Sequence, residues 1–315
     1  QHLTRTNRLA SPVYLVGESY GGFRGARLAH QLATQQGIAA AGVMLISPVL
    51  EFRFMSGDGF DVLPWALRLP SFAAVAREQK GSLSPEALAD AERFALSDYL
   101  VALAGGPGDG EAAQRFYARV AELIGLGEST VARWGGRVPV GVYVREMRRP
   151  DGQVLSRYDG SVAAPDPDPR SRGHEDDPVL QGSIAPFTRG FLAYARDELG
   201  FVTEQNYELL NGNVSRHWDW RDGDSGGRSS VGAADALRRA LALQPQLRVL
   251  IAHGLTDLTT PYMASRYVVD HLPRNVTASR VDLKLYPGGH MMYLRSGSRH
   301  RLHDDAQTFY QPAVE

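Results

Sequence analysis

The sequence predicts an α/β protein with a mostly parallel central sheet and a long, largely helical insertion. The first observation is a strand–helix–strand pattern near the start of the chain. Residues 13–16 are an apolar, β-forming run that leads through a glycine-rich turn at 17–22 into a helical pattern at 23–35. Residues 42–47 form a second buried run. The three segments together predict a βαβ unit with two parallel strands.

The second observation is that the last part of the chain returns to the same pattern. Residues 247–252 are a short, β-branched run followed by a helical pattern at 261–272. Residues 279–286 form another strand pattern, followed by a helix at about 298–310. We expect these two strands to rejoin the sheet that the first two begin.

The third observation is that the intervening region does not continue a parallel sheet. Its helical patterns cover residues 64–79, 84–104, 111–123, 128–134 and 187–199. Ser84, followed by Pro85, predicts a capped helix start. Alternating valines before a Pro-Asp-Gly turn predict a hairpin over 138–155, and the Pro- and Asp-rich segment 164–178 predicts an extended surface loop. The predicted organisation is therefore core at 1–50, cap insertion at 51–243 and core at 244–315.

Composition excludes several function classes. The chain has 315 residues and a formal net charge of −1, so there is no electrostatic case for binding nucleic acid or an acidic membrane surface. The absence of cysteine excludes disulfides, thiolate catalysis and zinc–thiolate sites, but leaves the cellular compartment open. The sequence contains no glycine-rich loop of the phosphate-binding type, so we expect no cofactor.

The first strand ends in Gly-x-Ser-x-Gly, at Gly17 to Gly21. Between a strand and a helix, this pattern is typical of the nucleophile turn of α/β-hydrolases. The turn holds Ser19 in a strained conformation, and we expect a β-carbon at Gly17 or Gly21 to collide with its neighbours. The N–H of Tyr20, at the helix start, could donate to an oxyanion. The simpler interpretation is an ordinary glycine–serine turn.

Two further residues complete the pattern of a serine hydrolase. Asp257 follows the third strand and His290 follows the fourth, so both are expected at the carboxyl edge of the sheet, where Ser19 also lies. The order Ser, Asp, His is the order of α/β-hydrolases. His290 would take the serine proton and Asp257 would orient the imidazole. Alternatively, Asp257 caps a helix and His290 belongs to a structural turn.

Other polar groups are weaker candidates. His253 is expected to be a packed neighbour of the site, while His300 and His303, near Asp304 and Asp305, have the spacing of a metal site but are better explained as a solvated helix face. We therefore predict no metal. Residues 217–220, His-Trp-Asp-Trp, are either ordinary core aromatics or part of a substrate pocket. Residues 213–215 fit the glycosylation sequon, a pattern that recurs by chance.

A family resemblance rests on the residues at the nucleophile, Gly17-Glu18-Ser19-Tyr20-Gly21-Gly22. They resemble the Gly-Glu-Ser-Tyr-Ala/Gly-Gly motif of the serine carboxypeptidases, and segments 3–12, 69–74 and 187–199 are similar to bacterial members. The segments at Asp257 and at His290–Met291 resemble the Gly-x-x-Asp and Gly-Gly-His-Met motifs of that family. The resemblance implies that Ser19 is the acylating nucleophile. It also implies that Glu18 holds the terminal carboxylate of the substrate by sharing a proton with a second acid.

The resemblance also suggests that strands of the sheet are missing at the N-terminus. The chain begins with Gln1 and reaches the nucleophile strand within about a dozen residues, whereas an α/β-hydrolase has several strands before that point. On this expectation the second oxyanion donor, in an Asn-Gly-Gly-type segment, and the partner acid of Glu18 lie upstream.

The sequence therefore predicts a serine-type carboxypeptidase that acts on peptides through an acyl-enzyme. An acid beside the nucleophile is of no use for a neutral ester, but when protonated it can hydrogen-bond a carboxylate, so we expect an acidic optimum for peptide hydrolysis. Two alternatives remain. The same triad could serve an esterase, an acyltransferase or a lyase, or the scaffold could be a non-catalytic binding protein.

Overall fold

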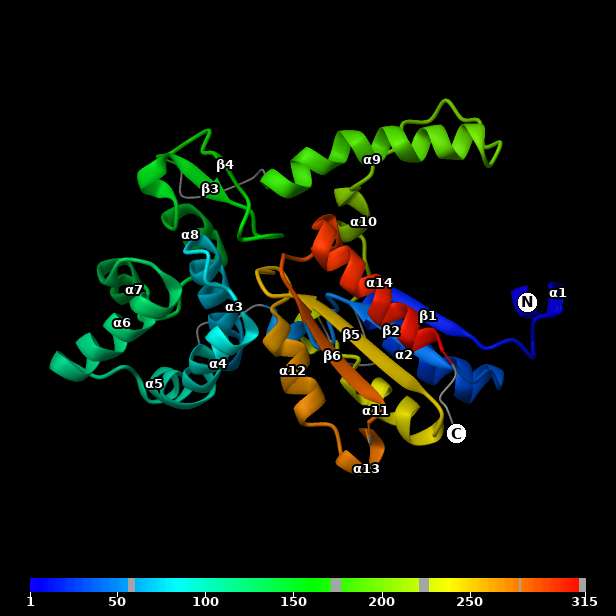
Figure 1. Ribbon diagram of the computed structural model, residues 1–315, viewed down its shortest axis with the longest axis horizontal. Coiled ribbons are helices and arrows are strands. Elements are labelled where there is room, and N and C mark those ends of the chain that lie inside the picture. Colours follow the sequence, from blue (N-terminus) through cyan, green and yellow to red (C-terminus); the bar gives the residue numbers. More distant parts are fainter. Residues whose placement is uncertain (56–59, 171–176, 221–226, 278, 312–315) are drawn as a thin grey trace.

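The sheet has four parallel strands, β1 (Tyr14–Glu18), β2 (Gly42–Ile46), β5 (Arg248–Gly254) and β6 (Val281–Tyr286), in the order β1-β2-β5-β6 (Figure 1). The computed structural model describes residues 1–55, 60–170, 177–220, 227–277 and 279–311. The chain is thus an α/β protein with a parallel sheet, as the sequence predicts. Because the strands are parallel, their carboxyl ends meet at one edge.

Helices cover both faces of the sheet, because alternate residues of the strands point to opposite sides. Val43 and Leu45 of β2 belong to the large core shared with α2 (Tyr20–Gln36), α11 (Ala234–Leu243) and α12 (Tyr262–Asp270). Met44 faces the other way, into a smaller core with Leu302 and Phe309 of α14 (Ser296–Tyr310). The result is three layers, with helix, sheet and helix.

The region between β2 and β5 is mainly helical, as predicted. Its longer helices are α3 (Leu63–Gln79), α4 (Pro85–Phe94), α6 (Gly110–Ile124) and α9 (Pro178–Asp197). A π-helical turn (Ala95–Tyr99) joins α4 to α5 (Leu100–Gly105), which gives the predicted long helix. The shorter elements are α7 (Glu128–Arg133), α8 (Val140–Glu146), α10 (Gly212–Arg216) and the strand pair β3 (Gln153–Leu155) and β4 (Ala163–Pro165).

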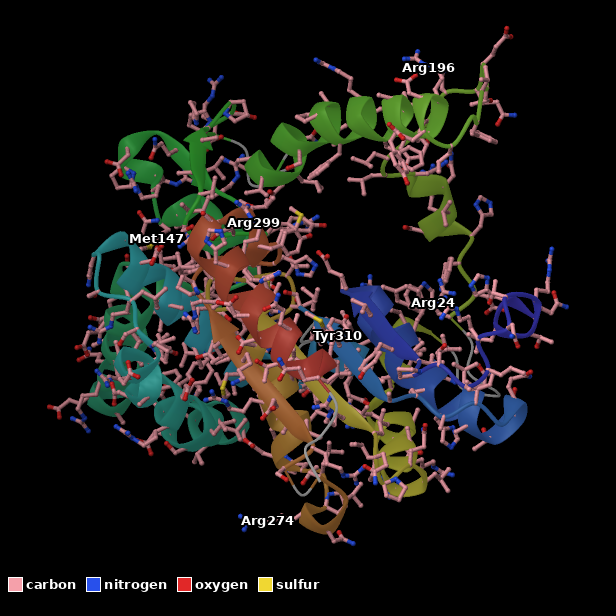
Figure 2. The ribbon with its side chains drawn as sticks, turned by 45° about the vertical axis from the view of Figure 1, so that its right-hand side comes forward. Arg24, Met147, Arg196, Arg274, Arg299 and Tyr310 are labelled. Carbon is pink, nitrogen blue, oxygen red and sulfur yellow. The ribbon has the colours of Figure 1, made fainter. Side chains whose placement is uncertain are left out.

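The parts of this region relate differently to the sheet. The core of α3 and α6 is continuous with the large core beneath the sheet, and α11 packs directly on α2. In contrast, α9 lies apart from the sheet in Figure 1, and Figure 2 shows Arg196, near its end, far from Arg274 of α13 (Arg274–Thr277). The remaining short elements are α1 (His2–Arg5) and the 3₁₀ turns Phe52–Phe54, Arg149–Asp151, Arg228–Ser230 and Met292–Leu294. None of the helices in the described ranges is long and apolar enough to cross a membrane.

The predicted hairpin over 138–155 is wrong, because its first arm is the helix α8. Tyr143 of α8 is fully buried, stacks on Phe72 and donates to the carbonyls of Phe72 and Ile124. This anchoring overrides the strand preference of the neighbouring valines, since β propensity depends strongly on packing context. The Pro-Asp-Gly turn does form, with Gly152 at φ 65°, but it leads into β3, which pairs with β4.

The prediction of a surface loop over 164–178 is only partly correct. Ala164 and Pro165 belong to β4, and Asp166 forms a buried ion pair with Arg145 at 2.8 Å. Asp177 is also buried, where it caps α9. Residues 171–176 lie outside the described part of the chain.

Removing the hydroxyl of Ser84 is expected to destabilise the protein by about 1 kcal/mol, because its oxygen accepts the N–H of Ala87 at the start of α4. Urea unfolding of Ser84→Ala would measure this loss. The matched control is Ser97→Ala, whose hydroxyl donates to a carbonyl within an exposed helix turn and should change stability by less than about 0.5 kcal/mol. Equal losses in both variants would contradict the capping role.

Candidate active site

Ser19 occupies a strained turn between β1 and α2. Its backbone has φ 57° and ψ −117°, which a residue other than glycine rarely adopts and which costs about 1–3 kcal/mol. The surrounding structure holds this conformation in place. The Ser19 N–H donates to Ile46 of β2, and its carbonyl accepts from the N–H groups of Gly22 and Val49.

Close backbone contacts explain the glycines around Ser19, with one correction. A β-carbon on Gly17 would lie 2.1 Å from the carbonyl oxygen of Gly21, so only glycine fits. Gly21 itself has open space where its β-carbon would be, so the predicted collision there is wrong. The second required glycine is Gly22, whose β-carbon would lie 2.4 Å from that of Pro48. The missed constraint comes from the chain after β2, which the local motif does not include.

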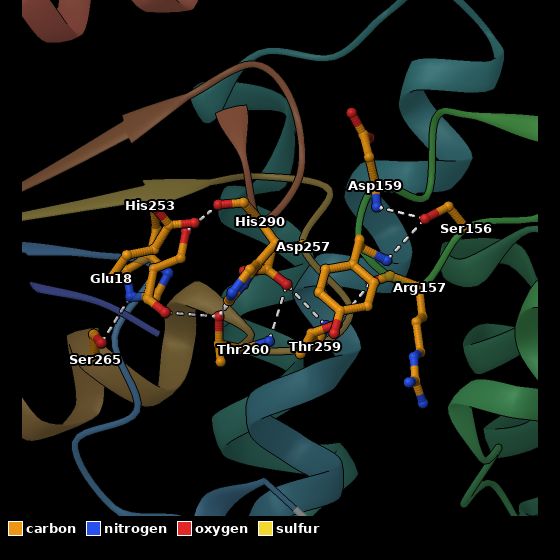
Figure 3. A network of polar contacts seen from close by, with 12 residues as sticks. Glu18, Ser156, Arg157, Asp159, His253, Asp257, Thr259, Thr260, Ser265 and His290 are labelled. Carbon is orange, nitrogen blue, oxygen red and sulfur yellow. Dashed lines mark hydrogen bonds and ion pairs between the residues drawn. The ribbon is translucent and has the colours of Figure 1, made fainter. Parts of the chain in front are cut away.

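Asp257 and His290 meet at the carboxyl edge of the sheet, as predicted. Both are buried, and the Nδ1 atom of His290 lies 2.8 Å from Oδ2 of Asp257 (Figure 3). The other carboxylate oxygen of Asp257 accepts the N–H groups of Thr259 and Thr260 at 2.8 and 2.9 Å. Asp257 therefore makes the backbone contacts of a cap and contacts the imidazole with the same carboxylate. Its hydrogen bonds fix the carboxylate against the imidazole.

Three positioning residues around His290 were missed by the sequence analysis. The hydroxyl of Ser47, just after β2, donates to the carbonyl of His290 at 2.8 Å. The backbone N–H of His290 donates to the carbonyl of Tyr158. The hydroxyl of Thr260 lies 2.6 Å from Oδ2 of Asp257 and 3.0 Å from Nδ1 of His290. These contacts join segments far apart in the sequence, so no local motif signals them.

Gly289 lets the cap region approach His290 this closely. A β-carbon on Gly289 would lie 2.0 Å from the carbonyl oxygen of Tyr158. Gly288, at φ 117°, occupies backbone space that favours glycine. Gly289 is thus required by the close approach of the segment at Tyr158, and Gly288 by its own backbone conformation.

The pKa values of the two buried histidines are shifted in opposite directions. Burial lowers the pKa of His290, but the nearby negative charges of Asp257 and Glu18 outweigh burial and leave it above its ordinary value. For His253, burial dominates and lowers the pKa to about 4. Nε2 of His253 lies 2.7 Å from the Ser265 hydroxyl, so His253 is the packed neighbour that was expected.

Glu18 faces Tyr293 rather than a second acid among the described residues. The Tyr293 hydroxyl lies 3.0 Å from both carboxylate oxygens of Glu18. Burial and the charge of Glu18 raise the pKa of Tyr293, so the phenol keeps its proton and donates it. Tyr293 follows the Gly-Gly-His segment by three residues, which is the only signal that could have identified it.

A cavity of about 410 Å³ opens beside Ser19. Its walls include Tyr20, Trp218 and Trp220, and the indole N–H of Trp218 donates to the Tyr20 hydroxyl at 3.2 Å. The two tryptophans of segment 217–220 therefore contribute to a pocket wall, which is one of the two interpretations given for this segment. Tyr20 is the first residue of α2, so its backbone N–H has no acceptor within the helix and lies beside the serine.

Ser19 and His290 share this edge of the sheet without a hydrogen bond between their side chains. Among the described residues no hydrogen bond joins the Ser19 hydroxyl to His290, and Thr260, which touches His290, lines the same cavity as Ser19. Catalytic hydrogen bonds are often long in unliganded enzymes and tighten when substrate binds. The arrangement suits proton transfer through Nε2 of His290, because Nδ1 is occupied by Asp257.

The other polar candidates do not gather into a site. In the described ranges no group of three His, Asp or Glu side chains could hold a metal ion. His303 contacts Asp304 on the exposed face of α14, while Asp305 accepts from the Tyr286 hydroxyl at 2.6 Å. Residues 213–215 lie in the exposed helix α10.

Comparisons with known proteins give little guidance. No family model and no curated protein matches the chain. Among solved structures the chain is similar to the crystal structure of VinJ, at 12% sequence identity over 98% of this chain and 69% of VinJ, with a TM-score of 0.34. A likeness this weak carries no argument about fold or function.

Substituting alanine at the two glycines of the motif should separate them. Gly17→Ala is expected to lose more than about 3 kcal/mol of stability, or to fail to fold, because its methyl group meets backbone. Gly21→Ala should be neutral or stabilise by up to about 1 kcal/mol, because alanine favours the helix and the space is open. Urea unfolding of both variants tests this, and a destabilised Gly21→Ala would contradict the geometry.

Removing the charge of Glu18 should shift the pH dependence of ester hydrolysis. If neutral His290 acts as the general base, the rate rises as pH rises through the pKa of His290. Glu18 raises that pKa, so Glu18→Gln should move the rising limb of kcat/KM to lower pH. The matched control is Asp282→Asn, which removes an exposed charge from β6 and should leave the limb in place. A limb that stays, or moves to higher pH, would contradict the coupling.

Proposed function

We propose that the protein is a serine hydrolase of the α/β-hydrolase type, and that its reaction is that of a serine carboxypeptidase. One observation carries the proposal. The Asp257–His290 pair, 2.8 Å apart, follows β5 and β6 at the sheet edge where Ser19 sits in its strained turn. The buried partners of this pair have no evident purpose in a simple structural turn, whereas a general base needs them.

The chemistry follows from these groups. The Ser19 Oγ attacks the carbonyl carbon of the scissile bond while its proton passes to Nε2 of His290. The resulting oxyanion accepts the N–H of Tyr20. The C–N bond then breaks, His290 returns the proton to the leaving amine, and a water molecule repeats the sequence to release the acyl group as a carboxylic acid.

The restriction to peptides with a free C-terminus rests on Glu18 and on the resemblance of its segment to serine carboxypeptidases. Glu18 directly precedes the nucleophile and is close enough to His290 to influence its pKa. A carboxyl group there could hydrogen-bond the terminal carboxylate of the residue that leaves. Tyr293 already shares that position and could orient the group.

Ester hydrolysis is the second candidate, and the Tyr293–Glu18 contact favours it. The single phenol proton lies between both oxygens of Glu18, so this carboxyl group already has a hydrogen-bond partner where a terminal carboxylate would bind. A site whose acid is engaged in this way suits a neutral ester better than a peptide acid. The two candidates share the triad and differ only in what Glu18 does.

Labelling with a fluorophosphonate probe tests the shared part. We expect the wild-type protein to be labelled, and Ser19→Ala, which removes the nucleophile, to remain unlabelled while keeping its fold. A folded wild-type protein that resists the probe would overturn the hydrolase proposal in favour of a binding protein.

Three substrates with one acyl part test the rest: an N-blocked dipeptide, its C-terminal amide, and the ethyl ester of its N-blocked first residue. A carboxypeptidase should prefer the free acid to the amide by at least about tenfold, and Glu18→Ala should reduce this preference. Ester cleavage without that preference would assign the protein as an esterase. Ser19→Ala should lose all three activities by about 10³-fold or more.

A further inference from the structure

A second, larger cavity continues from the one beside Ser19. Its volume is about 690 Å³, and it lies between α3, α8 and the segment around Tyr158. The two cavities share four wall residues: Phe52, Met55, Arg228 and Thr259. The two cavities therefore adjoin, and a substrate held at Ser19 lies next to the larger one.

The wall of this cavity contains Arg68 of α3, a buried cation that has no acidic partner among the described residues. The side chain is 95% enclosed, since Arg68 is only 5% exposed. Within the described part of the chain its guanidinium donates to the carbonyl of Met55, its Nε has no partner, and no carboxylate lies within ion-pair distance. Burial lowers its pKa to about 10, which still leaves it charged at neutral pH.

Arg145 shows how the same fold treats another buried arginine. Arg145 is 4% exposed and pairs with the buried carboxylate of Asp166 at 2.8 Å. An enclosed charge without such a partner is costly, because it loses its hydration and gains little in return. Arg68 would regain that loss if an anion entered the cavity.

Two further arginines line the same cavity. Arg157 and Arg228 both line it, and Arg228 lies over the rings of Phe52 and Trp220 at the boundary with the Ser19 cavity. The acid in the wall is Asp177, whose oxygens already accept from the Ser156 hydroxyl, the Arg157 N–H and the start of α9. Asp177 is thus engaged in fixing the chain and forms no ion pair with Arg68.

Glu18 and Arg157 lie to opposite sides of His290 in Figure 3, and Arg157 belongs to the wall of the larger cavity. If the leaving residue occupies the side of Glu18, the acyl part of the substrate extends toward Arg157 and Arg68.

We infer that the larger cavity binds the carboxylate of an acidic side chain on the acyl side of the scissile bond, and that Arg68 determines this specificity. This inference rests on the proposed function, because an acyl side exists only if Ser19 cleaves a peptide bond. Arginine suits the role because its planar fork can hold both oxygens of a carboxylate.

The kinetic test compares two N-blocked dipeptides that differ only in Glu or Gln before the same C-terminal residue. Wild-type protein should prefer the Glu substrate in kcat/KM by at least about tenfold, because the uncharged amide leaves Arg68 unpaired. Arg68→Met should abolish this ratio, and Arg68→Lys should keep part of it. No preference in the wild type, or a ratio unchanged in Arg68→Met, would overturn the inference.

Arg137 provides the matched control. Its guanidinium also donates to a backbone carbonyl, that of Leu103, and its Nε also has no partner, but it is not among the residues of the cavity wall. Arg137→Met should keep the Glu preference. If Arg68→Met instead reduces the discrimination between a peptide acid and its amide, the cavity holds the terminal carboxylate, and the assignment to a side chain is wrong.

Two measurements separate this inference from the proposed function. Calorimetry with Ser19→Ala should show tighter binding of the Glu dipeptide than of the Gln dipeptide, and the difference should disappear in Ser19→Ala/Arg68→Met even if the wild type hydrolyses neither. Without ligand, Arg68→Met should raise Tm, because it removes an unpaired buried charge. A lower Tm together with unchanged binding would make Arg68 merely structural.

Discussion

The buried carboxylate of Asp257 is the constraint on which the site depends. A fully enclosed carboxylate must be surrounded by donors, and each donor here comes from a segment that the fold has to place. Two backbone N–H groups and a hydroxyl come from the turn at Thr259 and Thr260, and the imidazole comes from the loop after β6. The parallel register brings those loops together, because β5 and β6 pair up to Gly254 and Tyr286. The contacts that stabilise the charge of Asp257 therefore also orient the imidazole of His290.

The same constraint ties the cap region to the sheet. The segment after β3 approaches both loops, since Thr256 donates to Asp159 at 2.6 Å, Gly160 donates to the carbonyl of Thr256, and Tyr158 accepts from His290. A β-carbon at Gly254 would lie 2.0 Å from the carbonyl oxygen of Gly289, so the two loops are equally close to each other. At this point the insertion forms part of the wall that holds the base, and a displacement of the segment would move His290.

Sequence patterns predicted the parts of this structure that depend on local physics. The strands, the turn at Ser19 and the placement of Asp257 and His290 after successive strands all follow from periodicity and from parallel topology. The helix at Val140–Glu146 could not be found in this way, because Tyr143 is anchored by Phe72, about 70 residues away. The contact between Ser47 and His290 likewise arises from the tertiary fold, which no short motif encodes. The same holds for the burial of Arg68 with an unpartnered Nε.

The proximity of Glu18 to His290 links the two roles that peptide hydrolysis would require. Ionised Glu18 raises the pKa of His290 and so reduces the fraction of neutral base at a given pH. A protonated Glu18, the form that can donate to a substrate carboxylate, has no such charge, and the pKa of His290 then falls toward the value set by burial and Asp257. The same carboxyl group would thus serve substrate binding and set the proton affinity of the neighbouring imidazole, so a change at Glu18 is expected to alter both.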